Sequence, residues 1–166
     1  MPHNNHVVDG INNDLVGKSL NYYLDLIGDY VSPYPDPVVK THEGVRVVRD
    51  DLLTGSKVRG GDLLATRVEQ ERMVYVQPRT GLAGVSLLDV CERRKKKLTL
   101  WMPSSKKVSP HQAICIERGA DARFLRIAAM PNLNKIAKEW AEEFGHFFIR
   151  LACATSSSLL ASSRQP

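Results

Sequence analysis

The sequence predicts an α/β protein: a mostly parallel sheet covered by helices on both faces, in three layers. Two observations lead to this prediction. From residue 38 onward, short apolar runs typical of strands alternate with longer segments whose apolar residues recur at helical spacing. Repeats of strand, helix and strand form right-handed crossovers, which place successive strands parallel in one sheet. We expect an N-terminal helix and a β-hairpin to precede this sheet.

The chain's 166 residues are enough for one domain with its own core, and its 25% charged and 43% hydrophobic residues are ordinary for a soluble protein. We divide the chain into an arm and helix (1–37), an α/β domain (38–151) and a serine-rich tail (152–166). No apolar run is long enough to span a bilayer, and the polar start is not a signal peptide. We therefore expect a cytoplasmic protein without a membrane partner.

The three cysteines are odd in number and lack the spacing of metal ligands. In a reducing compartment such cysteines are small buried hydrophobes, and no metal site is predicted. They are Cys91, Cys115 and Cys153.

Two elements are expected before the sheet. Apolar residues recur at helical spacing from residue 20 to Val31, with Ser19 placed as the cap, and three closely spaced prolines end this helix. The apolar runs 38–40 and 45–48 flank a glycine-containing turn, which predicts the hairpin.

Strands and helices then alternate to the end of the α/β domain. Ser109 and Gln112 form a capping-box pattern, and Gly119 and Gly145 stand where C-terminal helix glycines are expected. The predicted strands are 73–76, 98–101, 122–127 and 146–151, and the predicted helices lie around 63–68, 82–91, 110–118 and 133–144.

Three loops should meet at one edge of this sheet, because each follows the carboxyl end of a strand. Parallel sheets bind their ligands at this edge. They are the small-residue loop 54–61, the turn 77–81 and the loop 102–107. Lys57 lies in the first of them. Small residues let the backbone approach a ligand closely, and a lysine there can meet a phosphate or, when deprotonated, a carbonyl group. The sequence therefore predicts a shared ligand site.

Two other features allow a functional and an ordinary interpretation. The basic run RRKKK (93–97) could bind phosphates, but cations at the C-terminal end of a helix also complement its dipole in solvent. His111 could be a base, but a histidine in the first turn of a surface helix usually faces water. We favour the ordinary interpretation for both.

Three runs of residues now occur in a familiar order. They are VRDDL and TGSKVRG (48–52 and 54–60), LTLWMP followed by ERGAD (98–103 and 117–121), and AKEWAEEFGHFFI (137–149). Together they resemble the tryptophan-synthase-β superfamily of pyridoxal-phosphate-dependent enzymes, which includes threonine dehydratases, cysteine synthases and aminocyclopropane-carboxylate deaminases. The resemblance covers roughly residues 45–151.

This resemblance implies a lyase or deaminase that acts on amino acids. Lys57 would carry the aldehyde of pyridoxal phosphate as a Schiff base and, once freed, would move the substrate's α-proton. The turn 77–81 would lie against the ring or the substrate carboxylate. The predicted catalytic residue is Lys57, and the predicted cofactor-binding residues are Ser56, Lys57, Arg59, Arg79, Thr80 and Gly81.

The sequence departs from the family in two respects. The turn Arg79-Thr80-Gly81-Leu82 keeps the family's glycine but lacks its asparagine. The chain also ends where the family's larger lobe, with its phosphate loop, continues. We therefore expect a truncated relative, mostly the smaller lobe, that is inactive until a second copy or a partner completes its pocket.

A non-catalytic alternative stays open. In it, the same α/β domain is a binding or scaffold module that presents a basic face to a protein or, as the less favoured partner, a nucleic acid. A net charge of +5 permits such contacts without establishing them.

Overall fold

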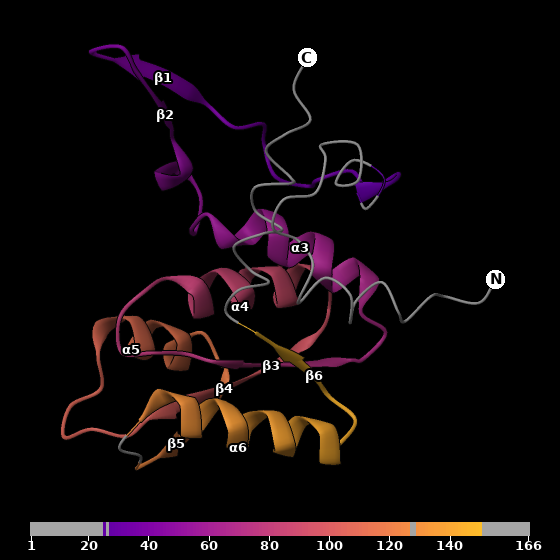
Figure 1. Cartoon of the computed structure of the whole chain (residues 1–166), viewed down its shortest axis with the longest axis vertical. Helices are drawn as coiled ribbons and strands as arrows, with labels where there is room; N and C mark the ends of the chain where they lie inside the picture. The colour runs from indigo at the N-terminus through magenta and orange to yellow at the C-terminus, as the bar shows by residue number, and fades with distance from the viewer. Residues whose placement is uncertain (1–24, 26, 127–128, 151–166) are drawn as a thin grey trace.

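The computed structural model of the chain describes residues 25, 27–126 and 129–150 (Figure 1). A hairpin comes first, followed by a 3₁₀ turn and then by alternating helices and strands. The elements are β1 (Val39–His42), β2 (Val45–Val48), η1 (Asp50–Leu52), α3 (Lys57–Arg67), β3 (Arg72–Val76), α4 (Ala83–Arg93), β4 (Lys97–Pro103), α5 (Pro110–Glu117), β5 (Asp121–Leu125), α6 (Met130–Glu143) and β6 (Phe147–Ile149).

Within the described residues, four strands form the main sheet in the order β5-β4-β3-β6, and every neighbouring pair is parallel. Helices α4 and α5 cover one face and α6 covers the other, while α3 lies on the outer side of α4 (Figure 1). The hairpin is antiparallel and separate from this sheet. The predicted α/β class, parallel sheet and hairpin are confirmed.

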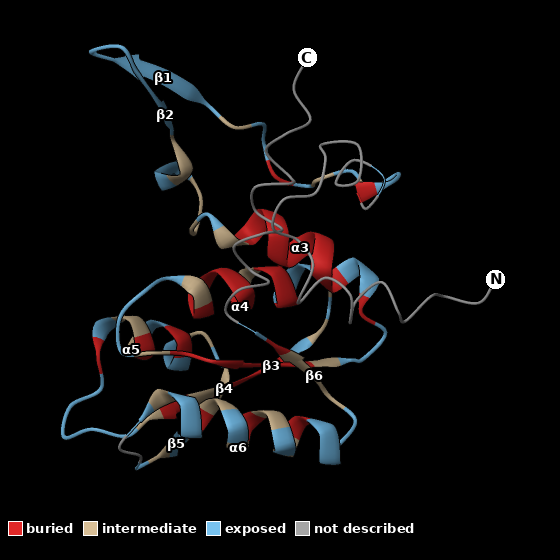
Figure 2. Cartoon of the chain, in the orientation of Figure 1, coloured by how far each residue is buried: buried red, intermediate tan, exposed pale blue. Residues whose placement is uncertain are grey.

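The core lies on both sides of strand β3. Met73 and Tyr75 belong to the cluster shared with α3 and α4, whereas Val74 and Val76 pack with α6. Successive side chains of a strand point to opposite faces, so a strand covered on both faces is apolar throughout. Figure 2 shows β3 buried and the hairpin exposed. The continuous apolar run in the sequence is explained by this double covering.

Helices α3 and α4 approach closely because α3 carries glycine at the contact. A Cβ atom on Gly61 would lie 3.1 Å from Leu87 Cδ2. On the same pair of helices, the buried carboxylate of Asp62 accepts two bonds from Arg94, at 2.8 and 2.6 Å, and one from the Tyr30 hydroxyl at 2.6 Å. An ion pair and a close contact therefore fix α3 to α4 and to the segment before the hairpin.

The structure moves two predicted boundaries. Lys57 is not in a loop but is the first residue of α3, which begins well before the predicted 63–68 segment. Gly60 and Gly61 are buried within this helix although glycine is a poor helix former, and Gly61 permits the contact with α4. Strand β4 continues to Pro103 rather than stopping at Trp101, because Pro103 still pairs with Leu125 of β5.

The remaining helices and strands of the α/β domain are present where the sequence predicts them, with ends that differ by up to three residues. Ser109 and Gln112 form the predicted capping box, and Gly119 and Gly145 have left-handed backbones, with φ of 85° and 66°. Cys91 and Cys115 are buried free thiols as expected, while Cys153 lies outside the described residues.

The arm, most of the predicted helix 20–31 and the serine-rich tail also lie outside the described residues. No helix in the described ranges has the length and hydrophobicity that a membrane span requires.

The basic run 93–97 is largely engaged with the rest of the fold. Arg94 pairs with Asp62, and Lys97 Nζ lies 2.7 Å from a Glu71 carboxylate oxygen. Lys96 Nζ donates to the carbonyl oxygens of Val68 and Gln70, both at 2.7 Å. The Arg93 guanidinium lies over the Tyr34 ring, 5.0 Å from its centroid. Four of the five cations therefore have partners within the fold, as the ordinary interpretation of this run expects.

Candidate functional site

Lys57 lies at the N-terminal end of α3, directly after a sharp bend in the chain. Gly55, two residues earlier, has φ of +142°, a conformation that residues with a side chain rarely adopt. The Lys57 side chain is partly buried, and this burial lowers the pKa of its ammonium group because water solvates the charge less well. At a given pH a larger fraction of this lysine is therefore the neutral, nucleophilic amine.

The loop before Lys57 is held against the beginning of α4. The Ser86 hydroxyl lies 3.3 Å from the Thr54 carbonyl oxygen and 2.9 Å from that of Leu82, so it can donate its single proton to either. A Cβ atom on Gly55 would be only 2.5 Å from Ser86 Oγ. Glycine is needed at this position both for the backbone angle and for the close approach.

The turn after β3 is closed by one buried side chain. Gln77 Nε2 donates to the carbonyl oxygens of Pro78 and Gly81, at 2.9 and 3.0 Å, and Gln77 Oε1 accepts from the Gly84 amide at 2.7 Å. A buried amide that satisfies three backbone groups fixes the shape of the turn. Arg79 and Thr80, in the middle of the turn, are exposed.

The third predicted loop lies next to this turn. Arg79 Nη2 is 3.5 Å from the carbonyl oxygen of Lys107, a long contact between the turn and the loop after β4. The Ser104 amide donates to the Leu125 carbonyl oxygen at 2.8 Å and joins the ends of β4 and β5. The carboxyl ends of β3, β4 and β5 therefore share one edge, and through Ser86 the Lys57 loop adjoins it.

The structure brings most of the predicted cofactor-binding residues to one edge of the sheet, but not Arg59. Four of them, Ser56, Arg79, Thr80 and Gly81, are exposed. Lys57 is half-buried and lies at the same edge of the sheet. Arg59 points elsewhere: its side chain is buried, and Nη1 donates to the Pro35 carbonyl oxygen at 2.7 Å. Its Nε also lies 3.8 Å from a carboxylate oxygen of Asp50. These contacts join α3 to the segments on either side of the hairpin.

Two residues that organise this edge, Gln77 and Ser86, were not singled out in the sequence. A glutamine directly after a buried strand is a usable signal, because a buried amide must find partners in the following turn. Ser86 gives no such signal, since a serine in a helix is common. Its role depends on the position of Thr54, which is distant in sequence.

Two helices begin at this edge, and the N-cap residue of each contributes no side-chain hydrogen bond. Among the described residues, neither Ser56 before α3 nor Leu82 before α4 makes a side-chain capping bond. The two N-termini are adjacent, since a Cβ atom on Gly55 would lie 3.4 Å from Leu82 Cβ. Helix N-termini present amide donors and the positive end of a dipole. An amine and two such N-termini suit a ligand that carries both a carbonyl and an anionic group.

No protein-family model matches the sequence, and no curated protein does either. Solved structures do match its fold. An ACC deaminase homologue aligns with a TM-score of 0.67 and 16% identity over 87% of this chain and 54% of its own. A threonine deaminase from T.th. aligns with a TM-score of 0.57 and 19% identity over 87% of this chain and 50% of its own.

A pyridoxal 5′-phosphate-dependent aspartate racemase gives a TM-score of 0.57 with 16% identity, over 87% of this chain and 50% of its own. Such matching structures are pyridoxal-phosphate-dependent enzymes of fold type II. At these identities the likeness shows the fold alone. The chain spans about half the length of the solved structures that it matches.

Proposed function

We propose that this chain forms the lysine-bearing part of a pyridoxal-phosphate-dependent enzyme that acts on amino acids by lyase or deaminase chemistry. The observation that carries the proposal is the position of Lys57. It stands as a half-buried amine of lowered pKa at the carboxyl edge of a sheet whose fold matches enzymes of this kind. Fold alone does not define function, so the proposal depends on this site.

Lys57 is proposed to bind the cofactor's aldehyde and to hold and move a proton at its Nζ atom. Both tasks need a neutral amine, and the lowered pKa favours this form. The contact between Ser86 and Thr54 would keep the backbone before Lys57 in place while its long side chain moves. When bound, pyridoxal phosphate supplies an electron sink that stabilises the carbanion formed at the substrate's α-carbon.

The residues at this edge fit part of the cofactor. The N-terminal ends of α3 and α4 would direct the positive ends of their dipoles at its phosphate or at a substrate carboxylate, while the Gly84 amide of α4 stays bonded to Gln77. A Cβ atom on Gly81 would meet no atom within 4 Å among the described residues, so space is open beside the turn. Arg79 and Thr80 would approach the anionic group from this turn.

We propose that a second copy or a partner completes this pocket. The chain covers about half of each matching structure, and its described residues present one lysine-bearing edge. A site formed between two bodies would exclude water better than an open edge, which strengthens charge interactions at the reacting atoms.

One observation supports the alternative of a binding module. Every residue of β1 and β2 is exposed, including valines that in most hairpins would be covered. Val45 alone is 62% exposed. An apolar hairpin that projects from the domain suits contact with another protein, and such contact needs no cofactor.

Titration with pyridoxal phosphate distinguishes the proposed enzyme from the binding module. The proposed enzyme develops a near-visible absorbance band that is absent in Lys57→Ala and retained in Lys135→Ala, a matched change at an exposed lysine of α6. A band of equal strength in all three proteins would come from surface lysines and would count against the proposed site. Circular dichroism confirms that each variant is folded.

A further inference from the structure

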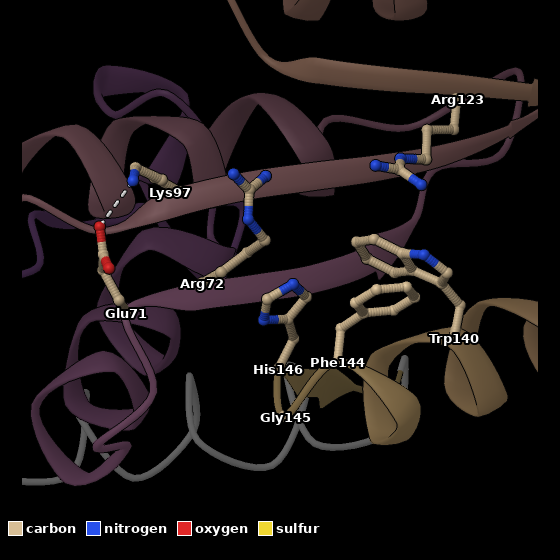
Figure 3. A pocket seen from close by; sticks show the side chains of 8 residues that line it. All are labelled: Glu71, Arg72, Lys97, Arg123, Trp140, Phe144, Gly145 and His146. Carbon is tan, nitrogen blue, oxygen red and sulfur yellow. Dashed lines mark ion pairs between the residues drawn. The ribbon is translucent and has the colours of Figure 1, made fainter.

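A cavity of about 600 Å³ lies on the α6 face of the sheet, away from the Lys57 edge (Figure 3). Arg72 and Lys97 are the first residues of β3 and β4, so the cavity opens toward the amino ends of these strands. Trp140 lies in the last turn of α6, Phe144 directly follows this helix, and His146 precedes β6. Its volume is in the range of small-molecule sites.

One side of the cavity is aromatic. The Trp140 ring lies 5.3 Å from that of Phe144 and 5.1 Å from that of His146, measured between ring centroids. Phe144 is 56% exposed although it belongs to this cluster. Figure 3 shows the Phe144 and His146 rings next to each other beside Trp140. An exposed phenylalanine at a cavity offers a flat apolar surface for another ring.

The other side is cationic. Arg72, Lys97 and Arg123 all line the cavity, and the Arg123 guanidinium carbon lies 4.0 Å from the Trp140 ring centroid. Two carboxylates partly balance these charges. Glu71 lies 2.7 Å from Lys97, and Asp121 lies 3.0 Å from Arg72 and 3.6 Å from Arg123.

Positive charge remains in excess within this group. Burial and, after it, Arg72 and Arg123 lower the pKa of the His146 imidazole, whereas Glu71 raises it.

We infer that this cavity binds a nucleoside monophosphate, with the phosphate on the cationic side and the base on Phe144. Arginine and lysine bind phosphate through charge-assisted hydrogen bonds, and aromatic side chains stack on any base. A ligand with both parts uses both sides of the cavity, whereas a simple anion uses only one. This site is separate from Lys57 and does not depend on the proposed enzymatic function.

The chain's own fluorescence provides the test. The sequence contains two tryptophans: Trp140 lines the cavity, and the Trp101 ring lies beside it, with the two centroids 5.9 Å apart. Titration with adenosine monophosphate should change tryptophan emission along a saturable curve. Adenosine and inorganic phosphate are titrated separately, and each should bind at least about tenfold more weakly than the complete nucleotide.

Variants then locate the binding. Phe144→Ala should raise the dissociation constant at least about fivefold by loss of stacking, and Lys97→Gln should do so by loss of a phosphate contact. Phe124→Ala removes an exposed phenylalanine that neighbours Arg123 in β5, and Lys135→Gln removes an exposed cation of α6. Neither residue lines the cavity, so both controls should retain the affinity, as should Lys57→Ala.

Three results would overturn this inference. They are no saturable change at millimolar nucleotide, an equal affinity for inorganic phosphate, and losses in the control variants that match those in Phe144→Ala and Lys97→Gln. Thermal unfolding of each variant shows whether a loss reflects unfolding, and Lys97→Gln, an exposed change, keeps the test valid if Phe144→Ala fails to fold.

Discussion

The Ser86 hydroxyl lies 3.3 Å from the carbonyl oxygen of Thr54 and joins helix α4 to the loop that ends at Lys57. These residues are 32 positions apart, and the contact places the lysine beside the turn that follows β3. Because a Cβ atom on Gly55 would come within 2.5 Å of the same hydroxyl, the loop has little freedom to relax. The loop before Lys57 is thus packed against α4 as well as continuous with α3.

Gly55→Ala should displace this loop. The change adds both backbone strain at φ of +142° and a clash with Ser86, which together are expected to lower the free energy of unfolding by about 2–4 kcal/mol. Urea denaturation measures the loss, and the Lys57-dependent absorbance with pyridoxal phosphate should weaken.

Gly119→Ala is the matched control. Gly119 has φ of +85°, but a Cβ atom added there would meet nothing within 4 Å among the described residues. The change should cost only the backbone strain, about 1 kcal/mol. Equal losses in both variants would show that the contact with Ser86 is unimportant.

Gln77→Glu tests the turn at the proposed site. The new side chain can still accept from the Gly84 amide, but it has no N–H for the carbonyl oxygens of Pro78 and Gly81. A buried carboxylate facing two carbonyl oxygens should cost about 2–3 kcal/mol, seen as a lower denaturation midpoint. Gln70→Glu makes the same change at an exposed residue and should alter stability by less than about 0.5 kcal/mol.

The lowered pKa of Lys57 predicts a shift in reactivity with pH. A lysine whose pKa is depressed keeps its neutral amine to lower pH. Borohydride-fixed labelling of Lys57 by pyridoxal phosphate should therefore continue to a lower pH than labelling of an ordinary lysine. The reference is the same peptide in the urea-unfolded chain. A midpoint for Lys57 labelling at equal or higher pH in the folded chain would contradict the effect of burial.

Asp62→Asn should destabilise the contact between α3 and α4. Arg94 and Tyr30 would lose the buried carboxylate that accepts three hydrogen bonds from them. The free energy of unfolding should fall by about 2 kcal/mol, less than for a fully buried pair, because water still reaches Arg94. Glu139→Gln breaks an exposed pair with Lys135 and should change stability by under about 0.5 kcal/mol. Chemical denaturation compares the two variants, and similar small effects would show that the Asp62 cluster contributes little.

The order of the elements could be predicted from the sequence because strand and helix periods are local. Residues 73–76 have the apolar pattern of a doubly covered strand, and Ser109 and Gln112 predict a helix start that the structure confirms. The start of α3 could not be predicted this way. Gly60 and Gly61 are poor helix formers alone, and only the packing of Gly61 against Leu87 explains their place in a helix.

The candidate site also has features that the sequence predicts and features that depend on tertiary contacts. Lys57 and the turn 77–81 could be placed at one edge, because the carboxyl ends of parallel strands meet there. The inward direction of Arg59 depends on the position of Pro35, and the closure of the turn depends on hydrogen bonds that Gln77 makes once it is buried. The cavity beside Trp140 combines residues from β3, β4, β5, α6 and the segment before β6, a proximity that exists only in the folded sheet.

The central claim is that Lys57 is the residue that binds pyridoxal phosphate, and peptide mapping after borohydride reduction tests it most directly. At a limiting concentration of cofactor, we predict one dominant modified peptide, the one that contains Lys57, with its loss in Lys57→Arg. Modification spread over exposed lysines such as Lys95, Lys106 and Lys107, and unchanged by Lys57→Arg, would contradict it.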